Sequence, residues 1–192
     1  MKKFLALSIC LMLAVFITTG CGKDTKENTS PAKESNKTEE VKSKGNCSVF
    51  ECIEKTTGKD TLEDMNKLIG FEGTVLREGT GWKTYSWKLN DTDSVETTFY
   101  STSSTTKINF KDDRIKNSKV SFAKYDELKK ALNNRESISY DKVKELFGGE
   151  EGTLVEKDNY SNKYRWVNAE GGYLNVSFNS DKTKCTMVMG RM

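Results

Sequence analysis

The sequence predicts an α+β fold of two tandem repeats, each a helix–loop–helix followed by a four-stranded antiparallel sheet. The main observation is that one pattern occurs twice: Leu-x-Gly, then Glu-Gly-Thr, then Tyr-x-Trp. Gly73 precedes Tyr85 by twelve residues, and Gly152 precedes Tyr164 by the same twelve. In both halves, apolar residues at helical spacing come before Glu-Gly-Thr, and strand-like alternation comes after it. Each repeat is small, so we expect the two to pack together.

The first twenty residues have the composition of an export signal. Lys2 and Lys3 are followed by an apolar run from Phe4 to Ile17, and small residues precede Cys21. The run is shorter than the roughly 20 apolar residues that a membrane-spanning helix needs. We therefore expect residues 1–20 to be a signal peptide.

Cys21 directly follows Gly20, in a stretch that reads Thr18-Thr19-Gly20-Cys21. This resembles the lipobox of bacterial lipoproteins, whose cysteine is diacylated and becomes the first residue after cleavage, although Thr18 stands where that family usually has an aliphatic residue. Two acyl chains on one cysteine anchor a protein stably. The resemblance implies that Cys21 carries a lipid on the extracytoplasmic face of a bacterial cell membrane. An ordinary secretory signal cut near Gly20, or an uncleaved anchor, is the alternative.

Residues 21–46 are expected to form a lipidated start followed by a disordered tether. Between 22 and 46 there is one valine, one alanine and no aromatic residue, so this stretch cannot bury enough apolar surface to offset its ordering. Residues 47–192 carry 23 basic and 23 acidic side chains, which makes the folded body formally neutral. A neutral body without a long basic run argues against a nucleic-acid partner.

Two short helices are expected to open the first repeat, 47–122. The first helix would place three residues on one face: Cys47, Phe50 and Ile53. Thr61 has the position of the N-cap of the second helix, with Asp64 as its capping-box partner. Gly70 has the position of the glycine that ends it.

The second repeat, 123–192, shows the same helix signals at an offset of 78 residues. Ser139 takes the place of Thr61, and Gly148 takes the place of Gly70. Its first helix would again place three residues on one face: Tyr125, Leu128 and Ala131.

Four strands are expected after each helix pair. In the first repeat they are Gly73–Arg77, Trp82–Leu89, Thr105–Phe110 and Ser118–Phe122. In the second they are Gly152–Glu156, Lys163–Val167, Tyr173–Phe178 and Lys184–Met189. Trp87 precedes Phe110 by 23 residues but Trp166 precedes Phe178 by twelve, which predicts an eleven-residue enlargement of one hairpin in the first repeat. The two four-stranded sheets are expected to lie side by side or to be continuous, with the helix pairs covering one face.

The pattern resembles the β-lactamase-inhibitor-protein-like fold, and more closely a family of bacterial surface lipoproteins of that fold with no assigned function. The residues that carry the resemblance are Ser139–Phe147 with Gly148, Glu151–Leu154, Tyr164–Trp166 and Val176–Phe178, with weaker copies in the first half. The resemblance implies a tandem α/β protein that binds another protein. In the inhibitor, sheet faces and a hairpin loop of the first repeat hold a class A β-lactamase, and Asp91 and Asp93 fall in a similar place. A cell-envelope assembly or structural scaffold lipoprotein is the alternative.

The sequence contains no histidine. This excludes Ser–His and Cys–His nucleophile pairs and imidazole metal ligands. We expect no catalytic residue, no metal and no cofactor, and therefore a binding protein rather than an enzyme.

Three cysteines remain outside the signal and the lipidation position: Cys47, Cys52 and Cys185. If both were helical, Cys47 and Cys52 would lie about 140° apart around the helix and would not meet. A disulfide from Cys185 to either of them is possible, and the sequence leaves the pairing open.

The candidate partner-binding residues are aromatic, acidic or methionine side chains. Each Tyr-x-Trp pair, Tyr85 with Trp87 and Tyr164 with Trp166, points to one face of its strand. The pairs either pack beneath the helices as core or line an open sheet face where a protein binds. Met187 and Met189 are aligned with Lys119 and Ser121, which favours an exposed or inter-repeat apolar strip. The remaining candidates lie in the enlarged hairpin: Asp91 and Asp93.

Overall fold

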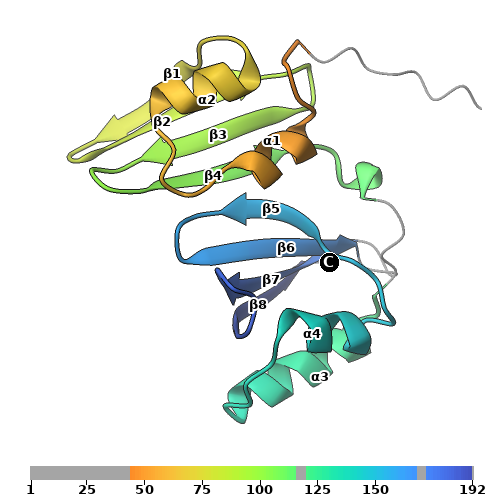
Figure 1. The fold of residues 1–192 in the computed structure, drawn as a ribbon. Helices are drawn as coiled ribbons and strands as arrows, with labels where there is room; N and C mark the ends of the chain where they lie inside the picture. The colour runs from red at the N-terminus through yellow and green to blue at the C-terminus, as the bar shows by residue number, and fades with distance from the viewer. Residues whose placement is uncertain (1–43, 116–119, 168–171, 192) are drawn as a thin grey trace, which may run out of the picture. The chain divides into compact units, whose positions relative to one another are not determined.

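The computed structural model describes residues 44–115, 120–167 and 172–191 (Figure 1). The chain divides into two compact units, and all of these residues belong to the unit Glu40–Met192. The predicted signal peptide, Cys21 and residues 22–43 of the predicted tether lie outside the described residues. Lys44 and Asn46 bond through their backbone N–H groups to the carbonyls of Leu89 and Ile69, so the folded body begins by Lys44.

The α+β class is confirmed: the described residues form four α-helices and eight strands (Figure 1). The elements of the first half are α1 Val49–Lys55, α2 Leu62–Ile69, β1 Thr74–Gly79, β2 Trp82–Lys88, β3 Ser94–Phe99, β4 Ser104–Asn109 and the short 3₁₀ helix η1 Asp112–Arg114. Those of the second half are α3 Phe122–Asn133, α4 Tyr140–Leu146, β5 Thr153–Lys157, β6 Ser161–Val167, β7 Tyr173–Asn179 and β8 Cys185–Arg191. The strands form one antiparallel sheet in chain order, β1 to β8.

The predicted helix caps are confirmed. Thr61 accepts a hydrogen bond from the backbone N–H of Asp64, and the Asp64 carboxylate accepts one from the N–H of Thr61. Gly70 ends α2 with φ at 95°, a left-handed conformation that favours glycine. Ser139 caps α4 by accepting from the N–H of Lys142. These local signals fix where the helices begin and end.

The predicted strand Thr105–Phe110 is confirmed as β4, but the predicted strand Ser118–Phe122 was wrong. Residues 118 and 119 lie outside the described residues, and Phe122 begins α3 instead of ending a strand. The missed strand is β3, Ser94–Phe99. Its inward positions include Thr97, which is fully buried and shares a hydrogen bond of 3.1 Å with Thr106 of β4. Because threonine fills these core positions, the apolar alternation that marks a strand is weak here.

The predicted eleven-residue enlargement of a hairpin is therefore also wrong. Trp87 lies opposite Val95 in the β2–β3 register, and Trp166 lies opposite Leu174 in the β6–β7 register. Each tryptophan thus precedes its partner by eight residues. The residues assigned to the enlargement form the turn before β3, β3 itself and the start of β4.

Two hydrophobic clusters hold the helices against one face of the sheet. In the first, Val49, Ile53 and Met65 of the helices meet Trp87 and Val95 of the strands. In the second, Leu128 of α3, Val143 of α4 and Phe147 directly after α4 pack on the strands β6 and β7. The strand residues of this cluster include Trp166, Leu174 and Phe178. The strand β6 alternates between buried and half-buried positions, as expected when one face is covered.

Candidate functional site

Trp87 and Trp166 belong to the core and not to a contact surface. Both side chains are fully buried. The indole of Trp87 donates to the Asn66 side chain and to the Phe71 carbonyl, at 3.0 and 3.1 Å. The indole of Trp166 donates to the Glu150 carbonyl at 2.9 Å. The candidate role of these two residues in partner binding is therefore corrected: they are the packed interior, satisfied by hydrogen bonds inside the protein.

The tyrosines of the same motif lie beside these rings. Tyr164 is 6% exposed, and its ring centroid is 4.7 Å from that of Tyr140. Tyr85 is half-buried against Phe99, with ring centroids 5.8 Å apart. Tyr164 is thus buried with the core, whereas part of Tyr85 stays accessible in the middle of β2.

The two acidic candidates have different environments. Asp91 is exposed in the turn between β2 and β3. Asp93 is buried and forms an ion pair with Arg114 of η1, while the Thr92 hydroxyl donates to its carboxylate at 3.0 Å. Burial acts to raise the pKa of Asp93, but the hydrogen bonds from Arg114 and its other neighbours outweigh it and leave the pKa below its ordinary value. Asp93 therefore stays charged and ties η1 to the hairpin turn, and Asp91 alone is available to a partner.

Met187 and Met189 lie on the sheet face opposite the α-helices. Their side chains are 51% and 45% exposed. Met187 lies opposite Ser177 and Met189 opposite Asn175, both on the non-core side of β7. Because β8 is the last strand of the sheet, the two methionines form an apolar strip along one edge of this face.

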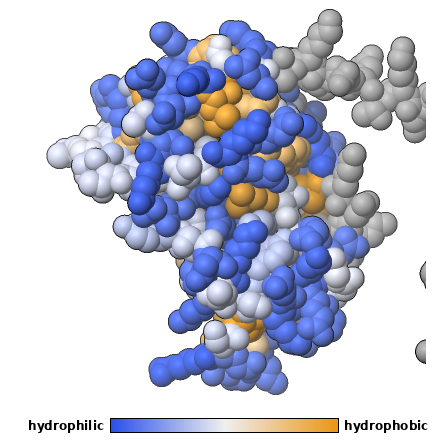
Figure 2. All heavy atoms as spheres, in the orientation of Figure 1, coloured by the Kyte–Doolittle hydropathy of each residue, from blue (hydrophilic) through white to orange (hydrophobic). Residues whose placement is uncertain are grey.

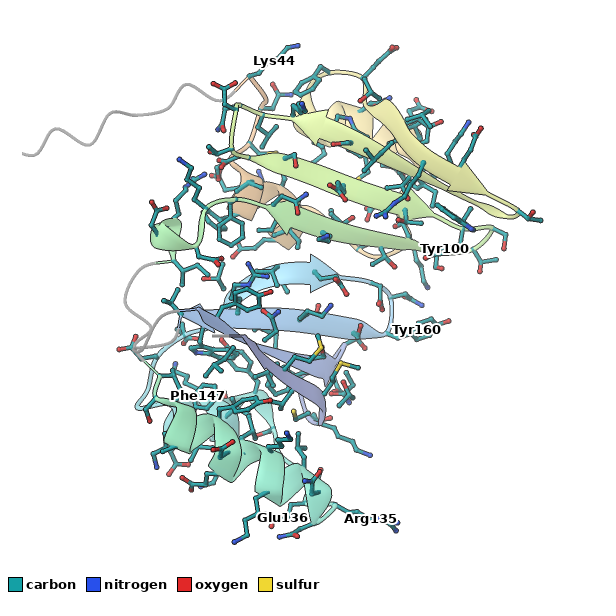
Figure 3. All side chains as sticks on the ribbon, turned by 180° about the vertical axis from the view of Figure 1, so that it is seen from behind. Lys44, Tyr100, Arg135, Glu136, Phe147 and Tyr160 are labelled. Carbon is teal, nitrogen blue, oxygen red and sulfur yellow. A yellow bond between two sulfur atoms is a disulfide. The ribbon has the colours of Figure 1, made fainter. Side chains whose placement is uncertain are left out.

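Charged residues form a row across the same face of the sheet. Figure 3 shows this face from the side away from α1 and α2. The strand registers align alternating charges: Glu96 of β3, Lys107 of β4, Glu156 of β5 and Lys163 of β6. The ammonium of Lys163 lies 2.5 Å from the Glu156 carboxylate. The row continues through Ser177 to Met187. We call Glu96, Lys107, Glu156 and Lys163 the charge row.

A second polar chain supports the methionine strip. Arg165 of β6 donates to the Asn175 side chain at 3.0 Å and to the Asp112 carboxylate at 2.8 Å. Its guanidinium also stacks 4.1 Å from the centroid of the Tyr173 ring. Asn175 is opposite Met189, so the apolar strip rests beside side chains that are already held in place.

Cys47 and Cys52 form a disulfide, with their Cα atoms 5.6 Å apart. The expectation that they would not meet depended on both being helical. Cys47 instead precedes Ser48, the N-cap of α1, so it can turn back toward Cys52. Cys185 is the free cysteine of the described part of the chain, and burial raises the pKa of its thiol to about 11. The disulfide between Cys47 and Cys52 therefore excludes the other possibility, a bridge from Cys185 to either of them.

Within 44–115, 120–167 and 172–191, no group of three or more cysteine or acidic side chains could hold a metal ion. No helix in the same ranges is long and apolar enough to cross a membrane. Comparisons of the chain with protein-family models, with curated proteins and with solved structures found no match.

Sequence reasoning missed several surface features. The charge row depends on which strand of the first half pairs with which strand of the second, and no local pattern indicates this pairing. Tyr100 and Tyr160, 48% and 75% exposed, follow β3 and β5 and project from neighbouring hairpin ends (Figure 3). Their position could have been inferred only from correct strand boundaries.

Proposed function

We propose that this chain is a lipid-anchored, extracytoplasmic protein-binding module without catalytic activity, and that it holds its partner on the sheet face that carries Met187 and Met189. The two methionines are the observation on which the proposal depends. Flexible thioether side chains adapt to an apolar surface, and apolar residues at the centre of an interface supply most of its binding energy. The charge row beside them would select a partner with complementary charges.

We further propose that the chain is built from two inhibitor-like α/β repeats, as the resemblance implies. Three observations support this. Gly73 packs on Trp87 as Gly152 packs on Trp166, and in both cases a Cβ would come within 2.5 Å of the indole. The strand that follows each glycine carries an irregularity at the same place, after Val75 and after Leu154. Both halves also run in the order helix, helix, four strands.

The disulfide supports the proposed location. Disulfides persist in oxidising compartments and are rare in the cytosol. The bridge between Cys47 and Cys52 therefore agrees with export, which the signal-like start of the chain and Cys21 suggest. Anchoring through two acyl chains on Cys21 would then hold the body outside the membrane.

Site-specific photo-crosslinking in intact cells tests the proposal. A photo-reactive residue replaces Ser177, which lies between the methionines and the charge row. We expect a defined crosslinked product that Met187→Ser with Met189→Ser reduces at least tenfold. The matched control changes Val75→Ser and Leu76→Ser, both 51% exposed on the opposite edge strand, and should leave the product unchanged.

Two outcomes would contradict the proposal. One is that no crosslinked product forms although the chain is folded and present in the membrane fraction. The other is that the methionine variant and the control variant lose the product equally. A thermal unfolding curve of each purified variant separates loss of binding from loss of folding.

A further inference from the structure

A cavity of about 840 Å³ lies on the helix side of β5 and β6. It is lined by residues of α1, α4 and η1, the two strands and the turn before β8. Tyr164 contributes to its wall from the core side of β6, whereas Lys163 and Arg165 point to the opposite face. The cavity is therefore separate from the methionine surface. Figure 2 shows that small hydrophobic patches on one face of the molecule are surrounded by hydrophilic residues.

The apolar part of the lining is aromatic and fixed in place. Phe50, Tyr140 and Tyr164 line the cavity, and the two tyrosine rings pack against each other. The hydroxyl of Tyr140 donates to the Glu151 carboxylate at 2.8 Å and accepts from the N–H of Gly152 at 3.1 Å. Burial is the main cause that raises the pKa of the Tyr140 hydroxyl, and the hydrogen bond to Glu151 raises it further. The Tyr140 side chain is therefore a neutral part of the cavity wall.

Lys182 is aimed over this wall by its backbone. Its φ of 63° is unusual for a residue other than glycine, and its carbonyl accepts a hydrogen bond from the N–H of Tyr140 at 2.9 Å. The ammonium lies 5.1 Å from the ring centroids of both Tyr140 and Tyr164. The turn between β7 and β8 fixes this conformation, since the N–H of Lys182 donates to the Asn179 carbonyl at 2.9 Å.

Lys157 lies on another side of the same cavity. Its ammonium donates a hydrogen bond to the Glu54 carbonyl at 3.0 Å. Among the described residues, no carboxylate lies within ion-pair distance of Lys157 or of Lys182. Burial lowers the pKa of Lys157; nearby Asp60 and Glu54 act against this, and the like charge of Lys182 adds to it. The other lining charges are occupied or at the rim: Arg114 pairs with Asp93, Glu151 pairs with Lys144, and Glu54 is exposed.

We infer that this cavity binds a small aromatic or apolar molecule that carries one oxyanion, a carboxylate or a phosphate. The ammonium groups of Lys157 and Lys182 hold the oxyanion, and the rings of Phe50, Tyr140 and Tyr164 contact the apolar body. An anion here relieves the repulsion between two lysines for which the described residues provide no carboxylate within ion-pair distance, although Glu151 attracts Lys182 from farther away. The cavity has the size of ordinary small-ligand sites, about 300–1,000 Å³. This site is independent of the proposed protein-binding surface.

Titrations of the isotope-labelled full chain at low ionic strength, followed by amide NMR shifts, test the inference. The probes are benzoate, phenyl phosphate, acetate and benzylammonium. We expect saturable shifts at Gly152 and the neighbouring strands with benzoate, phenyl phosphate or both, at least fivefold weaker binding of acetate, and no binding of benzylammonium. The tighter of the two aromatic anions distinguishes a carboxylate from a phosphate ligand.

Variants show whether the named lysines are responsible. Lys157→Gln with Lys182→Gln should weaken binding at least tenfold while amide shifts remote from the cavity stay unchanged, which shows that the fold is kept. Lys124→Gln with Lys142→Gln, two exposed lysines on α3 and α4, should change binding less than twofold. The inference is overturned if neither aromatic anion gives saturable shifts, if acetate binds as tightly as benzoate, or if the folded double variant binds like wild type.

Discussion

Gly73 and Gly152 are the residues on which the packing of the two buried tryptophans depends. Neither has the positive φ that favours glycine, so glycine is needed at these positions because a larger side chain would not fit beside the tryptophan. A Cβ on Gly152 would lie 2.5 Å from the Trp166 ring, and a Cβ on Gly73 would lie 2.5 Å from the Trp87 ring. This contact explains why Glu-Gly-Thr and Tyr-x-Trp occur together in both halves.

We predict that Gly152→Ala destabilises the protein by about 1–3 kcal/mol, because the added methyl group must displace a buried indole. Gly73→Ala should have a similar effect. Urea unfolding followed by circular dichroism measures the change. Thr102→Ala, at an exposed turn position, is the control and should stay within about 0.5 kcal/mol of wild type. Equal stability of Gly152→Ala and wild type would contradict the close approach.

The ion pair between Asp93 and Arg114 should make the stability of the fold depend on pH. The pKa of Asp93 is lower in the folded protein than its ordinary value of 3.8, so its charge stabilises the fold above that pH. This contribution is lost as the pH falls below 3.8 toward the folded pKa. We predict that Asp93→Asn costs about 1–2 kcal/mol at neutral pH, since one charged hydrogen-bond partner is removed.

The measurement is the free energy of unfolding of wild type and Asp93→Asn between pH 2 and pH 7. The difference between the two proteins should shrink below the ordinary pKa of an aspartate, because wild type loses the same interaction there. Asp91→Asn, at an exposed position in the same turn, is the control and should follow wild type. A difference that stays constant with pH would show that the charge of Asp93 is not what stabilises the turn.

At the scale of single elements, α1 is a helix of the first half that packs on a strand of the second half, β5. It packs on β3, β4 and β5, and its Glu54 carbonyl accepts the hydrogen bond from Lys157. The disulfide fixes the segment that leads into it, and both sulfurs are buried in the first core cluster. Reduction should therefore loosen α1 first.

We predict that Cys47→Ala with Cys52→Ala, or reduction of wild type, lowers stability by about 2 kcal/mol, the loop-closure contribution of so short a loop. The measurement is urea unfolding with and without dithiothreitol. The reductant should shift wild type and leave the double variant unchanged. Peptide mapping without reductant should find Cys185 alone alkylated after denaturation, among these three cysteines. A reductant-insensitive wild type would contradict the bridge.

At the scale of the whole described unit, few ladder pairs join the two halves. The strands β4 and β5 share the register pairs Thr106 with Lys157 and Lys107 with Glu156. Val155 of β5 packs into the core cluster of the first half, which adds an apolar contact across this junction. Since each half is small, we expect neither to be stable without the other.

We predict that the indole N–H signals of Trp87 and Trp166 disappear at the same urea concentration in wild type. Val155→Ala removes buried methyl groups and should cost about 1–3 kcal/mol, so both indole signals should disappear together at a lower urea concentration than in wild type. Val75→Ala, at a half-exposed position of β1, is the control. NMR spectra recorded along a urea series make the measurement. Separate transitions in wild type itself would show that the halves unfold independently.

Much of the fold could be predicted from local pattern, and the surface could not. Thr61, Ser139 and Gly70 were assigned correctly because a helix end depends on a few neighbouring residues. The strand β3 was missed because buried Thr97 looks polar in the sequence although a hydrogen bond to Thr106 satisfies it. The burial of both tryptophans supports one of the two interpretations that the motif allowed.

The sequence alone determined the α+β class, the helix caps and the recurrence of one motif in both halves, because each depends on periodicity and local hydrogen bonds. The tertiary structure decided which strands pair, that Cys47 bonds to Cys52, and which faces stay accessible. Strand pairing brings together residues that are distant in the chain, such as Lys107 and Glu156. The charge row, the methionine strip and the lysine-lined cavity all depend on that pairing, since their side chains come from strands or turns whose neighbours no local pattern specifies.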